Sequence, residues 1–253
     1  MSSIESTIQS VLQVFKVSLE DYDTLRPRPS MPILPLPQSP MDLAPYIDHT
    51  ILKADASPES IIKLCKEAAE YKFASVCINS CFVSLAKKEL SGTKIKICTV
   101  IGFPLGAMST AAKIAETRIA IEDGADEIDM VIQVGLLKAQ QFDVVYHEIK
   151  DIKSACNGKL LKVIIENAYL SDTEKIQACV LSKLASADFV KTSTGFAASG
   201  ATIEDVELMR QVVGTYYGVK AAGGIRDTAT AMAMVNAGAT RIGASAGISI
   251  IKG

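Results

Sequence analysis

The stretches FVKTSTG (residues 189–195) and GVKAAGG (residues 218–224) share one pattern: a β-like apolar run carries a lysine, and a turn of small residues follows. Lys191 and Lys220 are 29 positions apart, which is about one strand-plus-helix unit of an eightfold barrel. Lysines on neighbouring barrel strands can approach each other in the interior. Their mutual repulsion would lower the pKa of one of them, and a lysine that is neutral near pH 7 can attack a carbonyl carbon to form a Schiff base.

The rest of the chain from residue 46 onward alternates in the same way between β-rich runs and helical patterns. The β-rich runs lie at residues 46–52, 74–79, 95–102, 127–131, 161–166, 189–191, 218–221 and 240–242. Helix start signals occur between them, for example Ser57 before Pro58. This order predicts an α/β fold, the (β/α)8 or TIM barrel, over residues 46–253. A doubly wound open sheet is the main alternative, but no glycine-rich nucleotide loop follows the first strand.

The first 45 residues have a different character and predict an N-terminal extension. Apolar residues at helical spacing predict one amphipathic helix over residues 1–26; they are Ile4, Ile8, Val11, Leu12, Phe15 and Leu19. Residues 27–40 contain six prolines, which exclude a helix and favour an extended linker or an arm on the barrel. A proline-rich ligand for a partner domain is the alternative. The predicted organisation is a helix and proline-rich arm over residues 1–45, followed by the barrel.

Composition argues against several classes of partner. The net charge is −2 and the pI is about 5.8, so bulk electrostatics predicts neither a nucleic-acid nor a membrane partner. No apolar run approaches the ~20 residues of a membrane helix. Most of the six cysteines lie in apolar runs, and no secretory signal is visible, which together predict free thiols and a cytoplasmic location. Cys77 and Cys81 lack a second ligand pair, so no metal site is predicted.

Candidate catalytic residues follow from where barrel enzymes place their sites, at the carboxyl ends of the strands. The polar residues assigned to those ends are Asp48, Asn79, Asp129, Glu166, Lys191 and Lys220. Each alone has an ordinary explanation, because a lysine can extend to solvent and an acid can cap a helix. Together they predict a buried cluster of opposite charges in which Lys191, Lys220 and Asp129 do chemistry. For His49 we expect a structural hydrogen bond.

Turns of small residues after the last three strands predict a phosphate site. They lie at residues 194–195, 223–226 and 243–247. Barrels commonly bind phosphate through backbone N–H groups of the last loops, and glycine lets the backbone approach the anion. Simple tight turns are the alternative interpretation.

Six motifs in this order resemble those of the deoxyribose-phosphate aldolase family. They are IDHT (47–50), SVCI (75–78), VIGFPLG (100–106), EIDMV (127–131), FVKTSTG (189–195) and VKAAGGIR (219–226). The resemblance runs from about residue 46 to 251. It implies that Lys191 is the Schiff-base lysine, Lys220 the lysine that keeps it neutral, and Asp129 the acid/base group. The expected substrate and phosphate contacts are Asp48, Cys77, Thr192, Gly195, Gly223, Gly224, Arg226, Gly243 and Ser245.

The resemblance also implies a reaction, the reversible cleavage of 2-deoxy-D-ribose 5-phosphate to glyceraldehyde 3-phosphate and acetaldehyde. We expect no metal and no organic cofactor, and a homo-oligomer, most simply a dimer. Two departures from the family pattern fall in the phosphate loops: Phe196 stands where some members have lysine, and Ala246 replaces the second of two serines. A transaldolase-like enzyme and a non-catalytic sugar-phosphate-binding barrel are the remaining alternatives.

Overall fold

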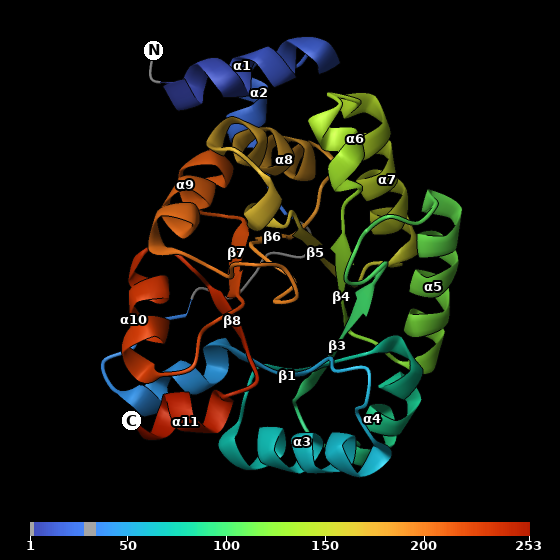
Figure 1. Ribbon diagram of the computed structural model, residues 1–253, viewed down its shortest axis with the longest axis vertical. Coiled ribbons are helices and arrows are strands. Elements are labelled where there is room, and N and C mark those ends of the chain that lie inside the picture. Colours follow the sequence, from blue (N-terminus) through green and yellow to red (C-terminus); the bar gives the residue numbers. More distant parts are fainter. Residues whose placement is uncertain (1–2, 28–33) are drawn as a thin grey trace.

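A computed structural model describes residues 3–27 and 34–253 of the chain as a closed eight-stranded barrel. All neighbouring strands are parallel and follow one another in sequence order, and the last strand pairs with the first (Figure 1). The strands are β1 (Ile47–Ile51), β2 (Ser75–Ile78), β3 (Lys96–Ile101), β4 (Glu127–Val131), β5 (Leu160–Ile164), β6 (Phe189–Lys191), β7 (Gly218–Ala222) and β8 (Arg241–Ala244). The prediction of a (β/α)8 barrel is confirmed.

Helices connect the strands and surround the barrel (Figure 1). The α-helices after β1 are α3 (Pro58–Tyr71), α4 (Val83–Glu89), α5 (Thr110–Asp123), α6 (Val134–Lys138), α7 (Phe142–Ala155), α8 (Asp172–Leu184), α9 (Ile203–Val213), α10 (Thr228–Asn236) and α11 (Gly247–Lys252). Short 3-10 helices are η1 (Pro40–Tyr46), η2 (Ser80–Phe82) and η3 (Asn167–Tyr169).

Local capping chemistry sets several of these helix ends. The Ser57 hydroxyl accepts a hydrogen bond from the N–H of Ser60 at the start of α3, and Pro58 occupies the first helical position. At the start of α8 the Ser171 hydroxyl accepts from the N–H of Glu174, and the Glu174 carboxylate accepts from the N–H of Ser171. Gly124 adopts a left-handed conformation with φ of 111° and ends α5. The local sequence therefore determines where these helices begin and end.

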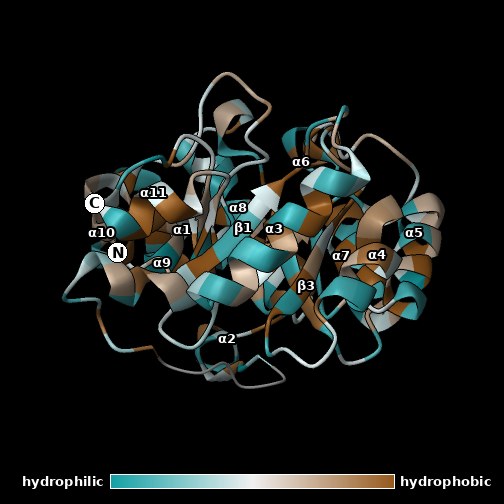
Figure 2. Cartoon of the chain, turned by 90° about the horizontal axis from the view of Figure 1, so that it is seen from below, coloured by the Kyte–Doolittle hydropathy of each residue, from teal (hydrophilic) through white to brown (hydrophobic). Residues whose placement is uncertain are grey.

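Aliphatic residues fill the space between the strands and the helices, but the interior of the barrel is charged. Figure 2 shows brown segments among the strands, but β1 is white and teal over much of its length, where its polar residues lie. Lys162 and Lys220 are among the largest side chains with no exposed surface. Buried charges are costly unless they are paired, so these lysines mark a built site within the barrel.

The N-terminal extension packs on the outside of the barrel, with α1 (Ser3–Phe15) lying against α8 (Figure 1). Val11 and Leu12 are buried and belong to the main hydrophobic core. The prediction of one helix over residues 1–26 is wrong, because the chain breaks at Lys16, which has φ of 54°. Ser18 then caps a second helix, α2 (Leu19–Thr24), by accepting from the N–H of Asp21.

The described part of the proline-rich segment contacts the barrel. The Tyr46 hydroxyl donates to the carbonyl of Pro35 at 3.0 Å, and Leu34 packs against the core. Residues 28–33, which carry part of the predicted arm, lie outside the described residues. Across residues 3–27 and 34–253, every helix is too short or too polar to cross a lipid bilayer.

Candidate active site

The two lysines of the opening motifs meet on one carboxylate inside the barrel. Lys191 ends β6 and pairs in register with Lys220 in the middle of β7. Their Nζ atoms lie 2.8 Å and 2.7 Å from the same oxygen, Oδ2 of Asp129 on β4. Asp129 and Lys220 have no exposed surface, whereas the Lys191 side chain retains 3%. The predicted trio is thus brought together, and Lys191 is its solvent-accessible member.

Asp48 belongs to the same cluster, but deeper in the barrel than predicted. It is the second residue of β1 and does not lie at the strand's carboxyl end, so that expectation is wrong. The expectation is also wrong for Asp129 and Lys220, which are the middle residues of β4 and β7. The predicted run of residues 46–52 already extended past Asp48, so the error was to assign a residue within the strand to its end. Asp48 Oδ2 lies 2.5 Å from Lys220 Nζ, and Oδ1 accepts from Ser75 at 2.6 Å. Asp48 therefore supports the charge of Lys220 and has no exposed surface of its own.

Three charged residues that we did not predict complete the cluster. Lys162 on β5 lies 2.8 Å from Asp129 Oδ1 and 2.5 Å from Glu127 Oε2. Arg241 at the start of β8 lies 2.7 Å from Asp48 Oδ1 and 3.2 Å from Glu127 Oε2. Oδ1 of Asp129 therefore binds Lys162, and Oδ2 binds the two predicted lysines, Lys191 and Lys220.

This arrangement shifts the ionisation of its members in opposite directions. Burial alone would raise the pKa of Asp129, but Lys162, Lys191 and Lys220 hold it well below the ordinary value. Burial alone would lower the pKa of Lys220, but Asp129 and Asp48 raise it above the ordinary value. Lys220 is therefore a permanent cation, and Asp129 is a carboxylate in the unliganded protein.

A signal for the missed lysine was present in the sequence. Lys162 interrupts the apolar run LLKVI (residues 160–164), as Lys191 and Lys220 interrupt theirs. It pairs in register with Asp129, which places it beside that carboxylate. Glu127 and Arg241 stand at the first positions of their strands, where a charged residue usually reaches solvent, so no comparable signal marks them.

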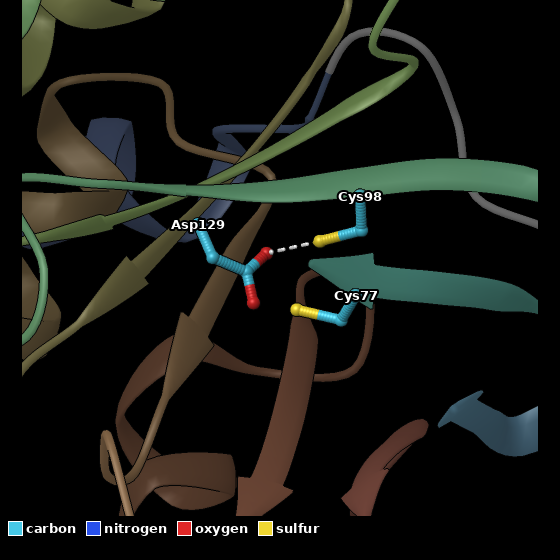
Figure 3. Close-up of side chains that lie close together, drawn as sticks. All are labelled: Cys77, Cys98 and Asp129. Atoms are coloured by element: carbon cyan, nitrogen blue, oxygen red, sulfur yellow. Dashed lines mark hydrogen bonds between the residues drawn. The ribbon is translucent and has the colours of Figure 1, made fainter. Parts of the chain in front are cut away.

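Two cysteines line the cluster on the side of β2 and β3. Cys77 pairs in register with Cys98, and Figure 3 shows both sulfur atoms near the Asp129 carboxylate. The Cys98 thiol donates to Asp129 Oδ1 at 3.1 Å. The neighbouring Cys98 thiol lowers the pKa of Cys77 to about 7, and Lys220 acts in the same direction. Burial instead raises the pKa of Cys98.

The sulfur atoms and one Asp129 oxygen lie within 4.8 Å of one another, which is a spacing that could hold a metal ion. The charges around them oppose such an ion. Lys162 Nζ lies 3.3 Å from Cys98 Sγ, and ammonium groups already bind both oxygens of Asp129. A divalent cation here would displace these ion pairs and face several positive charges at short range.

The loops after β6 and β7, where phosphate binding was predicted, interlock through small residues. The Thr192 hydroxyl accepts from the N–H of Ala222 and donates to its carbonyl, both at 3.1 Å. Gly195 and Gly223 have φ of 85° and 90° and lie in contact. A Cβ atom on Gly200 would lie 2.1 Å from the carbonyl oxygen of Gly223. Gly200 is a further residue that sequence reasoning missed.

The other predicted phosphate residues are placed less closely together. Gly224, Arg226 and Ser245 are exposed on the loops after β7 and β8. Gly243 lies inside β8 and not in a loop, and a Cβ atom there would stand 3.0 Å from Lys220 Cε. Gly243 therefore makes room for the Lys220 side chain.

Two further contacts shape the barrel mouth. Buried Glu166 accepts from the N–H of Thr194 and forms a short hydrogen bond with its hydroxyl, which holds the loop after Lys191. Phe196, 56% exposed, meets Phe103 edge to face with ring centroids 5.3 Å apart. His49 makes the expected structural contact, with Nε2 2.8 Å from Glu67 Oε2, outside the cluster.

The profile of the family described as DeoC/LacD family aldolase matches residues 43–253. A deoxyribose-phosphate aldolase of Mannheimia succiniciproducens is 58% identical over 214 residues, covering 85% of this chain and 96% of its own. One from Clostridium tetani is 56% identical over 213 residues, covering 84% and 99% of the two chains.

Solved structures agree over the whole length. A candidate deoxyribose-phosphate aldolase from Coccidioides immitis is 40% identical, with a TM-score of 0.85 over 99% of this chain and 97% of its own. A deoxyribose phosphate aldolase from Aeropyrum pernix, described as tetrameric, is 29% identical with a TM-score of 0.81, covering 100% and 97%. Through the profile match and the identities above 50%, this chain belongs to the DeoC/LacD family of aldolases.

Proposed function

We propose that this protein catalyses the reversible aldol cleavage of 2-deoxy-D-ribose 5-phosphate to D-glyceraldehyde 3-phosphate and acetaldehyde. The observation that carries the proposal is the pair of lysine nitrogens on one oxygen of Asp129, of which only the Lys191 side chain keeps any exposed surface, 3%. The family membership and the names of the relatives support the same substrate and reaction. The alternative of a non-catalytic barrel gives no reason to bury two lysines on one carboxylate.

In this proposal Lys191 is the nucleophile. Its neutral amine attacks C1 of the open-chain aldehyde, and loss of water from the carbinolamine gives a protonated imine bonded to the enzyme. The C2–C3 bond then breaks as the C3 hydroxyl loses its proton. The electron pair of that bond moves to the imine, so an enamine remains on Lys191 and glyceraldehyde 3-phosphate leaves. Protonation of the enamine at C2 and hydrolysis release acetaldehyde.

Asp129 is proposed to move the protons of these steps, through an ordered water where the distance requires it. In the unliganded protein the neighbouring lysines keep it a carboxylate, which suits a proton acceptor. When the cationic iminium on Lys191 becomes a neutral enamine, Asp129 loses one neighbouring positive charge and binds a proton more readily. Lys220 stays cationic throughout, because Asp129 and Asp48 hold its charge.

The loops after β6, β7 and β8 are proposed to hold the phosphate. Backbone N–H groups near Gly195 and Gly223, and the exposed Arg226 and Ser245, offer donors of the kind that bind anions at barrel mouths. We propose contact roles with the substrate for Cys77 and Thr192 as well. For Asp48 and Gly243 we propose support of Lys220, in keeping with their depth in the barrel.

Borohydride reduction in the presence of acetaldehyde tests the proposal. The reduced enzyme should gain the mass of one ethyl group on Lys191, found by peptide mapping. Lys191→Ala should lose both the adduct and the cleavage of deoxyribose 5-phosphate, while exposed Lys63→Ala should keep both. Cleavage by Lys191→Ala at near-parental rate would refute the nucleophile. Preference for a ketose phosphate over deoxyribose 5-phosphate would favour the transaldolase-like alternative.

We further propose a cytoplasmic homo-oligomer in which residues 1–45 form an extension to the barrel of residues 46–253. The relative from Aeropyrum pernix is described as a tetramer, so the subunit number is the part to measure. Light scattering on the purified full chain distinguishes a dimer from a tetramer. A monomer at enzymatic concentration would refute the proposal.

A further inference from the structure

The buried cluster carries more positive than negative charges. Its carboxylates are Asp48, Glu127 and Asp129, and its cations are Lys162, Lys191, Lys220 and Arg241. With every group ionised, three negative charges face four positive charges. While the Cys77 thiol keeps its proton, the cluster becomes electroneutral only when one of its four cations gives up a proton.

The contacts identify which cation is the surplus one. Lys220 reaches two carboxylates, Asp48 and Asp129, and Lys162 reaches Glu127 and Asp129 at 2.5 Å and 2.8 Å. Arg241 contacts Asp48 and Glu127 and remains charged as a guanidinium. Lys191 has a single carboxylate contact, to an oxygen that it shares with Lys220. It is also the one lysine of the three with any exposed side-chain surface.

We propose that the charge balance of the whole cluster, set by Lys162 and Glu127 together with the predicted residues, selects Lys191 as the neutral nucleophile. Lys162 and Glu127 are then positioning residues that act through Asp129 and never touch the substrate. The proposal rests on the function proposed above and deepens it. In this proposal the neutral state of Lys191 comes from the balance of all the charges in the cluster, and not from repulsion by Lys220 alone.

All eight strands face this cluster, so every group that can change its charge is known. Besides the seven charged residues, β2 and β3 contribute the thiols of Cys77 and Cys98. The Cys77 thiol, whose pKa the Cys98 thiol lowers to about 7, can add a negative charge above neutral pH. Among residues 3–27 and 34–253, four other acids are buried. Glu148 pairs with Lys113, Asp205 pairs with Lys175, and Glu166 binds Thr194. Asp188 pairs with Lys153 and also interacts electrostatically with Lys162, so it acts on the cluster from outside.

Charge-changing substitutions make opposite predictions for the pH dependence of imine formation. The acid limb is the pH range over which the rate of imine formation falls as Lys191 becomes protonated. Lys162→Met removes a cation, so the cluster holds the Lys191 proton more firmly, and the acid limb moves to higher pH by roughly 1–3 units. Glu127→Gln removes a carboxylate in a side chain of the same shape, so the limb moves down by a similar amount. The double variant restores the parental count and should return the limb toward the parental position.

The measurement is the initial rate of borohydride-trapped adduct on Lys191 with acetaldehyde, by mass spectrometry, between pH 5 and 9. Lys162→Arg, which keeps the charge, is the matched control and should show the parental limb. Each variant is repeated with Cys77→Ser, which removes the thiol that titrates in the same range. Circular dichroism and thermal unfolding show that the compared proteins are folded.

Several outcomes overturn the proposal. Limbs that stay in place, shifts of both single variants in the same direction, or a double variant displaced as far as a single one would each do so. Should Lys162→Met fail to fold, the isosteric Glu127→Gln decides alone, because only a downward shift agrees with the charge count. In all these cases trapping in the parent protein leaves the proposed function intact. Absence of any adduct in the parent would instead overturn both.

Discussion

Replacement of Gly200 by alanine should separate phosphate recognition from imine chemistry. Gly200 needs no unusual backbone angle, so only the added methyl group matters. That methyl would lie 2.1 Å from the Gly223 carbonyl oxygen, whereas contacts under 3.0 Å are essentially never seen. The backbone of the proposed phosphate loop must therefore move by about 1 Å, because a backbone carbonyl has no flexible end that can turn aside.

A displacement of about 1 Å at a binding group can reduce catalytic efficiency roughly 10²-fold. We expect a loss of that order in kcat/KM for deoxyribose 5-phosphate, mainly through a higher KM. Unphosphorylated 2-deoxyribose places no demand on this loop, so its cleavage should keep the parental kcat/KM. The ratio of the two efficiencies is the quantity to report, from a coupled assay of the aldehyde products.

Gly135→Ala is the matched control, since Gly135 lies in α6 and a methyl group there meets nothing within 4 Å. It should leave both substrates unaffected. An equal loss for the two substrates in Gly200→Ala would refute the reasoning, because the strain would then have reached the lysines. Unchanged cleavage of the phosphorylated substrate would also refute it, by showing that the loop takes no part in phosphate binding.

Three further outcomes follow from the structure. Leu12→Ala should lower the free energy of unfolding by about 2–5 kcal/mol in urea titrations, whereas half-exposed Val14→Ala should change it little; equal effects would mean that α1 does not pack as described. Because the pKa of Cys77 is lowered to about 7, the ultraviolet absorbance of its thiolate, measured as the difference between the parent and Cys77→Ser, should rise through neutral pH; a difference that first rises near pH 9 would contradict the shift. Dialysis against a chelator should leave turnover unchanged, since ammonium groups occupy both oxygens of Asp129, and a loss restored by added metal would show that an ion displaces them.

The strand order and the central pair were predictable from the sequence for a definite reason. In a barrel that follows chain order, one strand-plus-helix unit separates neighbours, so the spacing of Lys191 and Lys220 fixes them side by side. The glycine at position 124 and the capping serines are local signals that act within a single turn. The break of the N-terminal helix at Lys16 was missed because the apolar spacing continues through it, although Ser18 two residues later is a capping signal of the same kind.

Depth inside the barrel was not predictable. The stagger between strands decides which residues share a layer, and that stagger depends on closure of all eight strands. Asp48 was therefore assigned to the mouth, although the register places it beside Ser75 and Gly243. Lys162 was missed for the same reason: its role depends on the carboxylates of other strands that surround it, and not on its own sequence neighbours.

The distribution of the cluster over the chain has a consequence for recombining such barrels. Asp48, Glu127 and Asp129 all precede residue 132, whereas Lys162, Lys191, Lys220 and Arg241 all follow it. The first half of the barrel thus contributes the acids and the second half the bases. A chimera that joins either half to an uncharged counterpart would enclose several like charges at once, so the two halves of this protein can be inherited or exchanged only as a matched set.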